Sequence, residues 1–248
     1  MSEQLPPAPA NNEVAYAERG TGTETLELLE SAEAYNRRIV ELIRPYLGRE
    51  NAELGAGQGT LSEIVGATHS VLPFELAEHN QRLLRQRFSG HPRVAPCRAD
   101  LLSYQAWESL DCIYSANVLE HIEDDLRLIQ HSARLLKHGG WFVAFVPAGA
   151  WLYSRFDQAL GHRRRYGARD RERLARLEHE PASLVLREFR HVNALGALGW
   201  FVRMRLLGRT RLEASDVKLA ERLLPLIRLV DRLNLPFGQS VLMAMERQ

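Results

Sequence analysis

Glu53-Leu54-Gly55-Ala56-Gly57-Gln58-Gly59 is the stretch that decides the fold. An acidic residue followed by three glycines in five positions is typical of a strand that ends in a tight turn. Glycine tolerates positive φ and has no Cβ, so the backbone can pass close beneath a ligand and present N–H groups at the start of a helix. Adenine-containing cofactors bind at such turns, although the same pattern also occurs as a plain strand-to-helix connection.

The third glycine falls one residue too early for a dinucleotide-binding fingerprint. The pattern G-x-G-x-x-G needs glycine at position 60, which is Thr60. The mismatch argues against a pyrophosphate and makes a nicotinamide dehydrogenase the least expected function. It favours a cofactor without phosphates, whose cationic amino group would be attracted by Glu53.

Length and composition indicate one cytoplasmic α/β domain. The chain has 248 residues, 45% hydrophobic content and a net charge of +1, which suggests no global attraction to nucleic acid. Residues 1–10 carry an early acid and three prolines and predict a disordered tail rather than a signal peptide. The apolar run over residues 192–202 is shorter than the ~20 residues that span a bilayer. Cys97 and Cys112 are too few for a disulfide scaffold.

From residue 49 to 147, short apolar runs alternate with amphipathic stretches, which predicts βαβ units around a parallel sheet. The predicted strands are Ala52–Leu54, Ser70–Phe74, Arg93–Pro96, Leu110–Tyr114 and Trp141–Val146, followed later by Leu184–Val192 and Ser240–Met245. Apolar residues at alternating spacings of four and three predict a helix over 122–136. Acidic residues 123–125 fit its first turn, and Gly139-Gly140 its end. An amphipathic stretch, Ala32–Leu47, is expected to cover the cofactor mouth.

Two acids follow predicted strands at the edge where ligands of open parallel sheets bind. Glu75 ends the second strand, where a carboxylate could accept both hydroxyls of a ribose. Asp100 follows the third strand and could take an adenine amino group, while the Leu101 N–H takes a ring nitrogen. Each acid alone is explained more simply as a solvated or capping residue, but Glu53, Glu75 and Asp100 together at the expected strand ends support a cofactor site.

These motifs together resemble the class I S-adenosylmethionine-dependent methyltransferases. Residues 53–59 look like their first motif, Phe74-Glu75-Leu76 like the ribose-binding acid, Ala99-Asp100 like the adenine-binding acid, and residues 110–122 and 135–147 like the fourth-strand and closing segments. The resemblance covers about a hundred residues and implies S-adenosylmethionine as cofactor. Its expected ligands are Glu53, Gly55, Ala56, Gly57, Glu75, Leu76, Asp100, Leu101 and Asn117. One departure is Asn51-Ala52, where the family usually has branched apolar residues.

The resemblance implies a Rossmann-like, mostly parallel seven-stranded sheet with an antiparallel last strand and helices on both faces. We expect residues 1–48 to form a tail and lid helix, 49–147 the cofactor-binding core, and 148–248 an acceptor-side lid, a helical insert and the final strands of the same domain. The carboxyl-terminal half resembles a subset of the family that carries Asp157 to Tyr166 and a late Asn193. This subset implies methyl transfer to a small or lipid-linked acceptor without naming it.

Candidate catalytic residues are His162, Tyr166 and Asn117, and candidate acceptor-binding residues are Tyr35, Arg164, Arg165 and Asn193. His162 or Tyr166 could act as a base or position the acceptor, and the arginines could bind a carboxylate or phosphate. Alternatively, His162 and the arginines tie the lid to the core through Asp157. Arginines 169, 171, 173 and 176 alternate with acids and are typical of a solvated helix face.

A divalent metal site is a further possibility, but the sequence does not favour it. Glu120 and His121, with a remote His162, could bind a divalent ion. Metal-assisted relatives carry a second glutamate where this chain has Asn117, a poorer ligand. His121 then has a structural role, and Asn117 lines the methyl-transfer site.

The stretch between residues 192 and 240 is longer than a plain connection, and such inserts are usually functional. Residues 196–211 carry four arginines and no acid, and residues 217–230 are strongly apolar. The insert is interpreted first as a cap over the acceptor pocket, then as a dimer surface, and last as a face that touches a membrane. Monomer and homodimer both stay open.

The expected function is transfer of a methyl group from S-adenosylmethionine to a small acceptor, including a lipid-like molecule or a biosynthetic intermediate. A second enzyme class uses the same cofactor: a cyclase would fold the amino group onto its own γ-carbon and release methylthioadenosine and an azetidine-type amino acid. Tyr35 or Tyr166 could stabilise the cation there. A third alternative is a cofactor-binding protein without turnover.

Overall fold

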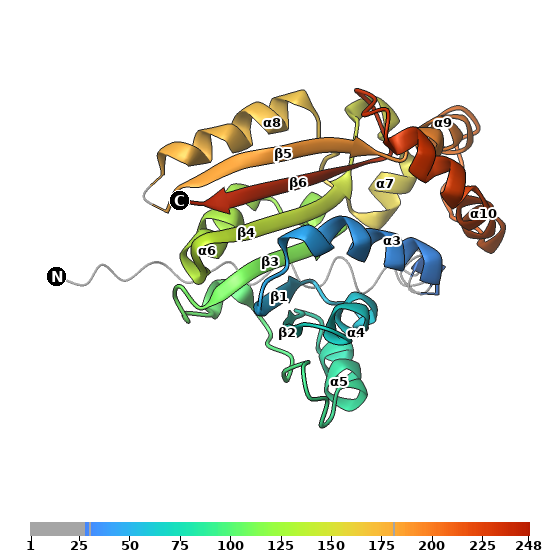
Figure 1. Ribbon diagram of the computed structural model, residues 1–248. Coiled ribbons are helices and arrows are strands. Elements are labelled where there is room, and N and C mark those ends of the chain that lie inside the picture. The colour runs from blue at the N-terminus through green and yellow to red at the C-terminus, as the bar shows by residue number, and fades with distance from the viewer. Residues whose placement is uncertain (1–27, 30, 181) are drawn as a thin grey trace.

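The computed structural model describes residues 28, 29, 31–180 and 182–248, so the predicted tail at residues 1–10 lies outside the described residues. A six-stranded sheet forms the centre, with the strand order β2-β1-β3-β4-β6-β5 (Figure 1). Strands β1 to β4 are parallel, and β6 runs antiparallel to both of its neighbours. The mostly parallel α/β fold with an antiparallel last strand is therefore confirmed.

The six strands match all but one of the predicted ones. They are β1 (Glu50–Leu54), β2 (Ser70–Phe74), β3 (Leu110–Ala116), β4 (Leu136–Pro147), β5 (Leu184–Val192) and β6 (Ser240–Arg247). The prediction of seven strands is wrong, because residues 93–96 form no strand. This segment meets β2 only through isolated parallel bridges at Val94 and Arg98. The Val71 N–H donates to the Arg93 carbonyl, but Pro73, the next residue of β2 that faces this segment, has no N–H to donate to the Ala95 carbonyl, which interrupts the ladder.

Asn51, the departure from the family pattern, has a structural explanation in β1. Its side chain is buried and its amide nitrogen donates to the carbonyls of Gly48 and Ser70, each at 2.9 Å. Its amide oxygen accepts from the Gly48 N–H at 2.9 Å. A branched apolar residue could not satisfy these backbone groups at the start of the strand.

Helices cover both faces of the sheet, as expected (Figure 1). On one face, α3 (Glu33–Ile43) and α4 (Thr60–Gly66) pack against Tyr114 and Phe145. On the other, α6 (Asp125–Leu135) and α8 (Ala168–Ala175) pack against Ile113 and Phe142. Neighbouring strand residues alternate between the two cores, as the two-residue period of a strand requires. A smaller cluster of Ala56, Leu84, Phe88 and Val94 lies beside α5 (Glu78–Arg87).

Helix α6 confirms the apolar period but not its expected end. Asp124 caps the first turn by accepting from the Arg127 N–H at 3.1 Å. The helix stops at Leu135, and Leu136 already belongs to β4. Gly139 and Gly140 therefore lie in the strand, where a Cβ on Gly140 would lie 2.8 Å from the Lys137 carbonyl.

The carboxyl-terminal insert contains α9 (Ala194–Trp200), a π-helix (Phe201–Leu206) and α10 (Ala214–Asp231). With α7 (Arg155–Leu160), it gathers at the end of the sheet toward which β4 runs (Figure 1). Helix α10 is tied to the lid helix α3 by ion pairs that join Arg228 to Glu41 and Arg38 to Asp231. In the described part of the chain, the helices are too short or too polar to cross a membrane.

Candidate functional site

The glycine turn has the backbone conformation that its sequence predicts. Gly55, Gly57 and Gly59 have φ angles of +69°, +55° and +93°. A Cβ on Gly55 would lie 2.5 Å from Val118 Cγ2, and one on Gly59 would lie 2.6 Å from the Phe88 ring. Glycine is thus required at both positions, by conformation and by packing.

The N–H groups of this turn are bonded within the protein. Those of Gly55 and Ala56 donate to the Phe74 carbonyl at 2.8 and 2.9 Å, and that of Gly59 donates to the Ala56 carbonyl at 2.8 Å. The Gly57 N–H donates to Glu75 Oε2 at 2.8 Å. These four N–H groups are therefore already used within the protein. What the turn offers a ligand is a backbone with little side-chain bulk, which the ligand can approach closely.

Glu53 supports the turn from β1. Its side chain is buried, and Oε2 accepts from Ser62 Oγ at 2.5 Å and from the Tyr114 hydroxyl at 3.2 Å. Burial raises the pKa of Tyr114 well above its usual range, and the nearby charge of Glu53 raises it further. Glu53 thus places a negative charge beneath the turn, between α4 and β3.

Glu75 and Asp100 lie at the same edge as the turn. Glu75 Oε1 accepts from the Ala77 N–H at 2.9 Å, and the Glu75 N–H donates to the Arg98 carbonyl at 3.0 Å. Burial raises the pKa of Glu75, although these backbone donors oppose the shift. Asp100 begins a short 3-10 helix (Leu101–Ser103) and accepts from the Leu102 N–H at 2.9 Å. Its neighbour Leu101 is buried, whereas Leu76 is 51% exposed.

Asn117 follows β3 in the left-handed conformation, with φ +55°. Its N–H donates to the Phe145 carbonyl at 2.8 Å, and its side chain hydrogen-bonds Tyr35 of the lid helix. Burial raises the pKa of Tyr35 to about 12, and the charge of Glu120 acts in the same direction. The structure therefore brings Tyr35 of α3 together with Asn117 and Glu120, which both lie in the segment after β3.

Glu120 lies in the 3-10 turn Leu119–His121 with no exposed surface. Burial raises its pKa to about 7, although the charge of His162 opposes the shift. His162 Nε2 lies 3.9 Å from Glu120 Oε1, and the ring of His121 meets that of His162 edge to face at 4.8 Å. Burial lowers the pKa of His121 to about 3, and the charge of His162 contributes.

Asp157, in α7, hydrogen-bonds both His162 and Arg165. Asp157 Oδ1 accepts from His162 Nδ1 at 2.9 Å and from Arg165 Nε at 2.7 Å. Arg165 also donates to the Ala148 carbonyl and stacks over the Trp200 ring at 4.8 Å. The Arg165 guanidinium is thus committed inside the protein, which disfavours its expected role in acceptor binding.

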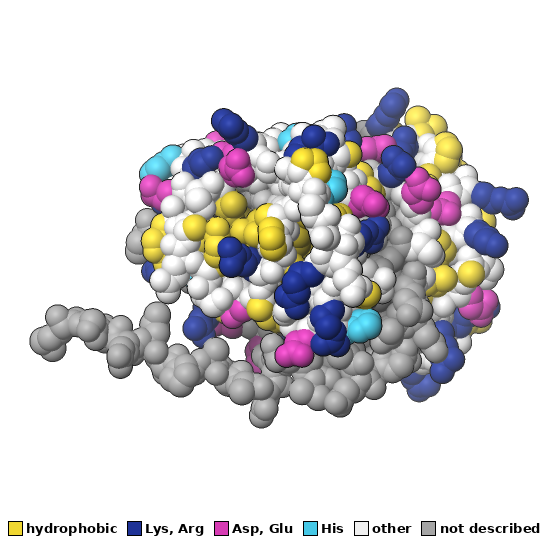
Figure 2. Space-filling model, turned by 90° about the horizontal axis from the view of Figure 1, so that it is seen from below, with side chains coloured by type: hydrophobic (Ala, Val, Ile, Leu, Met, Phe, Trp, Pro, Cys, Tyr) yellow, Lys and Arg dark blue, Asp and Glu magenta, His cyan; other side chains and the backbone are white. Residues whose placement is uncertain are grey.

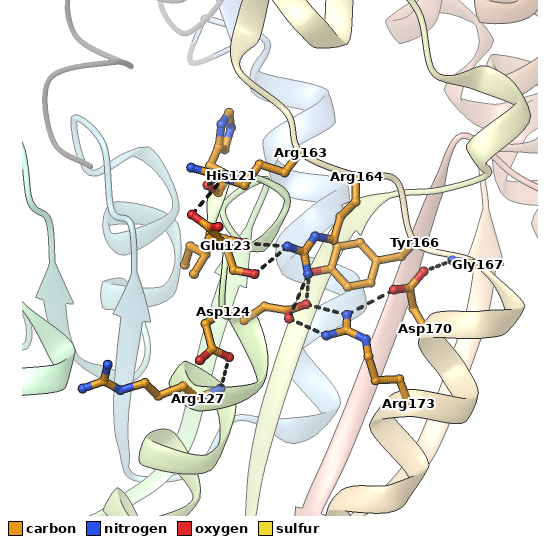
Figure 3. A network of polar contacts seen from close by, with 12 residues as sticks. His121, Glu123, Asp124, Arg127, Arg163, Arg164, Tyr166, Gly167, Asp170 and Arg173 are labelled. Carbon is orange, nitrogen blue, oxygen red and sulfur yellow. Dashed lines mark hydrogen bonds and ion pairs between the residues drawn. The ribbon is translucent and has the colours of Figure 1, made fainter. Parts of the chain in front are cut away.

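A second polar network centres on the buried Asp125. It includes Arg164 and Tyr166, two other residues expected at the site (Figure 3). The Tyr166 hydroxyl donates to Asp125 Oδ2 at 2.7 Å, and Arg164 donates to Oδ1 at 3.0 Å. Arg173 donates to both oxygens, at 2.6 and 2.8 Å, so it does not belong to a purely solvated face. This geometry favours structural roles for Tyr166 and Arg164.

Asn193, the remaining expected acceptor residue, caps α9. Its side chain accepts from the Gly196 N–H at 2.8 Å and donates to Gln239 at 2.7 Å. Sequence reasoning missed Asp125 and gave Asp157 only a linking role, because neither follows a strand and each acquires its partners through tertiary contacts.

The insert is less basic and more apolar at its surface than expected. Arg203 pairs with Asp216, and Arg209 lies 3.6 Å from Glu213, so acids of α10 offset part of the charge. Figure 2 shows basic and acidic side chains interspersed over the described surface of that view. Large apolar side chains at least 37% exposed are Leu198, Val202, Leu206, Leu207, Leu219, Leu223, Leu226, Leu229 and Leu233. A dimer contact and a membrane contact would each use such a face.

Two cavities of about 580 and 860 Å³ lie along the edge strand β5. The larger is lined by Trp151, Arg165 and Phe189, and the smaller by Arg38 and Arg232. Neither lining includes the glycine turn, Glu75 or Asp100, so we place the cofactor by the strand ends and not by these cavities.

Residues 52–144 match a family model described as a methyltransferase domain. This part of the chain is thus similar to methyltransferase domains. The match begins in β1 and ends in β4, and so contains the glycine turn, Glu75, Asp100, Asn117 and Glu120. No curated protein matches the chain.

Solved methyltransferase structures share the fold of this chain. Haemonchus contortus phosphoethanolamine N-methyltransferase 1, in complex with phosphoethanolamine and S-adenosylhomocysteine, has a TM-score of 0.58 and 13% identity over 95% of this chain and 47% of its own. Phosphoethanolamine N-methyltransferase 2 of the same organism, in complex with S-adenosyl-L-methionine, has a TM-score of 0.60 and 15% identity. The match covers 94% of this chain and 58% of that enzyme. A putative methyltransferase from Bacillus halodurans has a TM-score of 0.54 and 16% identity. The match covers 85% of this chain and 98% of that protein. The chain thus spans about half the length of the first two enzymes.

Proposed function

We propose that the protein transfers the methyl group of S-adenosylmethionine to a small acceptor at the carboxyl edge of the sheet. The observation that carries this proposal is the convergence of the glycine turn, Glu75 and Asp100 at that edge of a methyltransferase domain. Each residue follows a different strand or bridge, so only the folded sheet assembles them.

The cofactor is proposed to lie across the turn at Gly55, Ala56 and Gly57. The Glu75 carboxylate is held in place by the N–H groups of Gly57 and Ala77, one on each oxygen, and by the Asn80 side chain, and we expect it to face the ribose hydroxyls. Asp100 then faces the adenine amino group, and the Leu101 N–H the ring. Glu53 acts as a positioning residue, because its buried carboxylate holds the turn through Ser62 and Tyr114.

The methyl group is proposed to face Asn117, with Tyr35 of the lid helix opposite. A sulfonium methyl is already activated, so the protein has chiefly to align the acceptor with the S–C bond and exclude water. The hydrogen bond between Tyr35 and Asn117 joins α3 to the end of β3 and closes the site from above. Helix α10 supports this closure through its ion pairs to α3.

We propose only that the acceptor is a small molecule. The Haemonchus contortus enzyme of this fold was solved in complex with phosphoethanolamine, a small phosphorylated amine, and S-adenosylhomocysteine. In this chain, however, Arg164 and Arg165 are bonded to Asp125 and Asp157 and do not supply an equivalent anion site.

Product analysis tests the proposal. Purified protein is incubated with S-adenosylmethionine that carries a deuterated methyl group and with a pool of low-molecular-weight metabolites, and products are identified by mass spectrometry. We expect S-adenosylhomocysteine and one labelled product in equal amounts. Methylthioadenosine formed without an acceptor would contradict methyl transfer and indicate the cyclase. Cofactor binding with no product from any acceptor pool would indicate a binding protein.

A further inference from the structure

The carboxylate of Glu120 has no hydrogen-bond partner among the described residues, and the His162 ring lies 3.9 Å from it. The side chain has no exposed surface, and neither Oε1 nor Oε2 has a hydrogen-bond partner within the described part of the chain. An unpaired buried carboxylate destabilises a fold by several kcal/mol. Charges in such places are normally paired or bound to a metal.

Two histidines face this carboxylate. One potential ligand atom from each of Glu120, His121 and His162 lies within 4.8 Å of the others. Zinc bonds to nitrogen and oxygen of about 2.0–2.2 Å place tetrahedral ligands roughly 3.4 Å apart. The 3.9 Å between His162 Nε2 and Glu120 Oε1 is close to this value, and the ligand atom of His121 lies within 4.8 Å of both.

The groups behind the histidines prepare both rings for coordination. Asp157 accepts from His162 Nδ1, so the lone pair of that ring is on Nε2, the atom nearest to Glu120. Asp157 is itself held by the N–H and Oγ of Ser154, each at 2.9 Å. The His121 ring donates to the Gly161 carbonyl, which fixes its tautomer in the same way. A carboxylate or carbonyl behind each ligating histidine is the usual outer shell of a metal site.

We propose that Glu120, His121 and His162 bind one divalent transition-metal ion, for which Zn²⁺ is the best fit. Two imidazoles and one carboxylate leave a fourth position open, as in zinc sites that take a water molecule or a substrate oxygen. The sequence disfavoured a metal because Asn117 is a poor ligand. The structure adds that the remote His162, from the segment after α7, lies beside Glu120 and His121, so three ligands are present without Asn117. The inference goes beyond methyl transfer and does not depend on it.

The test is metal binding by the full chain, without an affinity tag and after treatment with a chelator. Zn²⁺ is titrated by calorimetry, and Co²⁺ is added separately to read the visible absorption of a four-coordinate site. We expect one ion per chain. Glu120→Gln and His162→Gln should lose this binding, and Asp157→Asn should weaken it about 10–100-fold, as removal of outer-shell groups does.

His191→Gln is the matched control, because His191 is half-buried in β5 and lies outside the three-residue cluster. It should bind Zn²⁺ as the wild type does. Glu120→Gln keeps the shape of the side chain and removes its buried charge, so the variant should fold, which circular dichroism checks. Wild-type binding no tighter than that of Glu120→Gln, or an equal loss in His191→Gln, would overturn the proposal. S-adenosylmethionine affinity is measured on the same samples, so a failed metal site and a failed cofactor site are distinguished.

Discussion

Replacing Gly55 with alanine tests why the turn after β1 needs glycine. At φ +69° an L-residue is strained by roughly 1–2 kcal/mol. The new Cβ would also lie 2.5 Å from Val118 Cγ2, and overpacking of this kind costs typically about 1–3 kcal/mol. We therefore expect Gly55→Ala to lower the free energy of unfolding by about 2–5 kcal/mol, measured by urea titration.

Two further variants separate strain from packing. Gly139→Ala is the matched control, since Gly139 has φ +75° and a Cβ there would meet nothing within 4 Å. It should cost only the conformational part, roughly 1–2 kcal/mol. Val118→Ala makes room at Gly55, so the double variant Gly55→Ala/Val118→Ala should be destabilised by less than the sum of the single changes. If Gly55→Ala costs no more than Gly139→Ala, or if the two changes at Gly55 and Val118 are additive, the packing argument is refuted.

The remaining predictions concern the cofactor edge and the Asp125 network. Asp100→Ala should weaken S-adenosylmethionine and S-adenosylhomocysteine about tenfold to a hundredfold in calorimetry, because a hydrogen bond to a charged group contributes about 1.5–3 kcal/mol. Asp124→Ala removes a comparable helix cap away from this edge and should leave both affinities unchanged; equal binding by Asp100→Ala would contradict the assigned site. Tyr166→Phe should lower the free energy of unfolding by about 1–3 kcal/mol without changing kcat, because the hydroxyl donates to buried Asp125. A large fall in kcat at unchanged stability would restore the catalytic role.

Features that depend on local chemistry could be predicted from the sequence. The apolar period over residues 122–136 locates α6 because one helical face must be buried, and the glycines at 55, 57 and 59 predict the turn because few other residues adopt positive φ. The missing strand at residues 93–96 depends on Pro73 of the neighbouring strand, whose lack of an N–H matters only once the two segments are paired.

Pairing between distant side chains could not be predicted in the same way. Nothing near Tyr166 in the sequence indicates Asp125 as its partner. Glu120 and His162 are grouped in the sequence only as possible metal ligands, and nothing near either residue indicates that the Glu120 carboxylate is buried. Such pairs depend on how the segment after β4 folds back over β3, which periodicity does not encode. The cofactor residues were easier to predict because strand ends of a parallel sheet share one edge.

The position of β6 between β4 and β5 imposes an order on folding. Strand β5 precedes β6 in the chain, yet β6 is its only neighbour in the described sheet. Strand β4 likewise pairs with β6 across the whole insert, as in the partners Val146 and Val241. These contacts close long loops, which slows folding and leaves strand edges unpaired until late. The parallel half of the sheet, which carries the cofactor edge, can therefore assemble before the antiparallel half does.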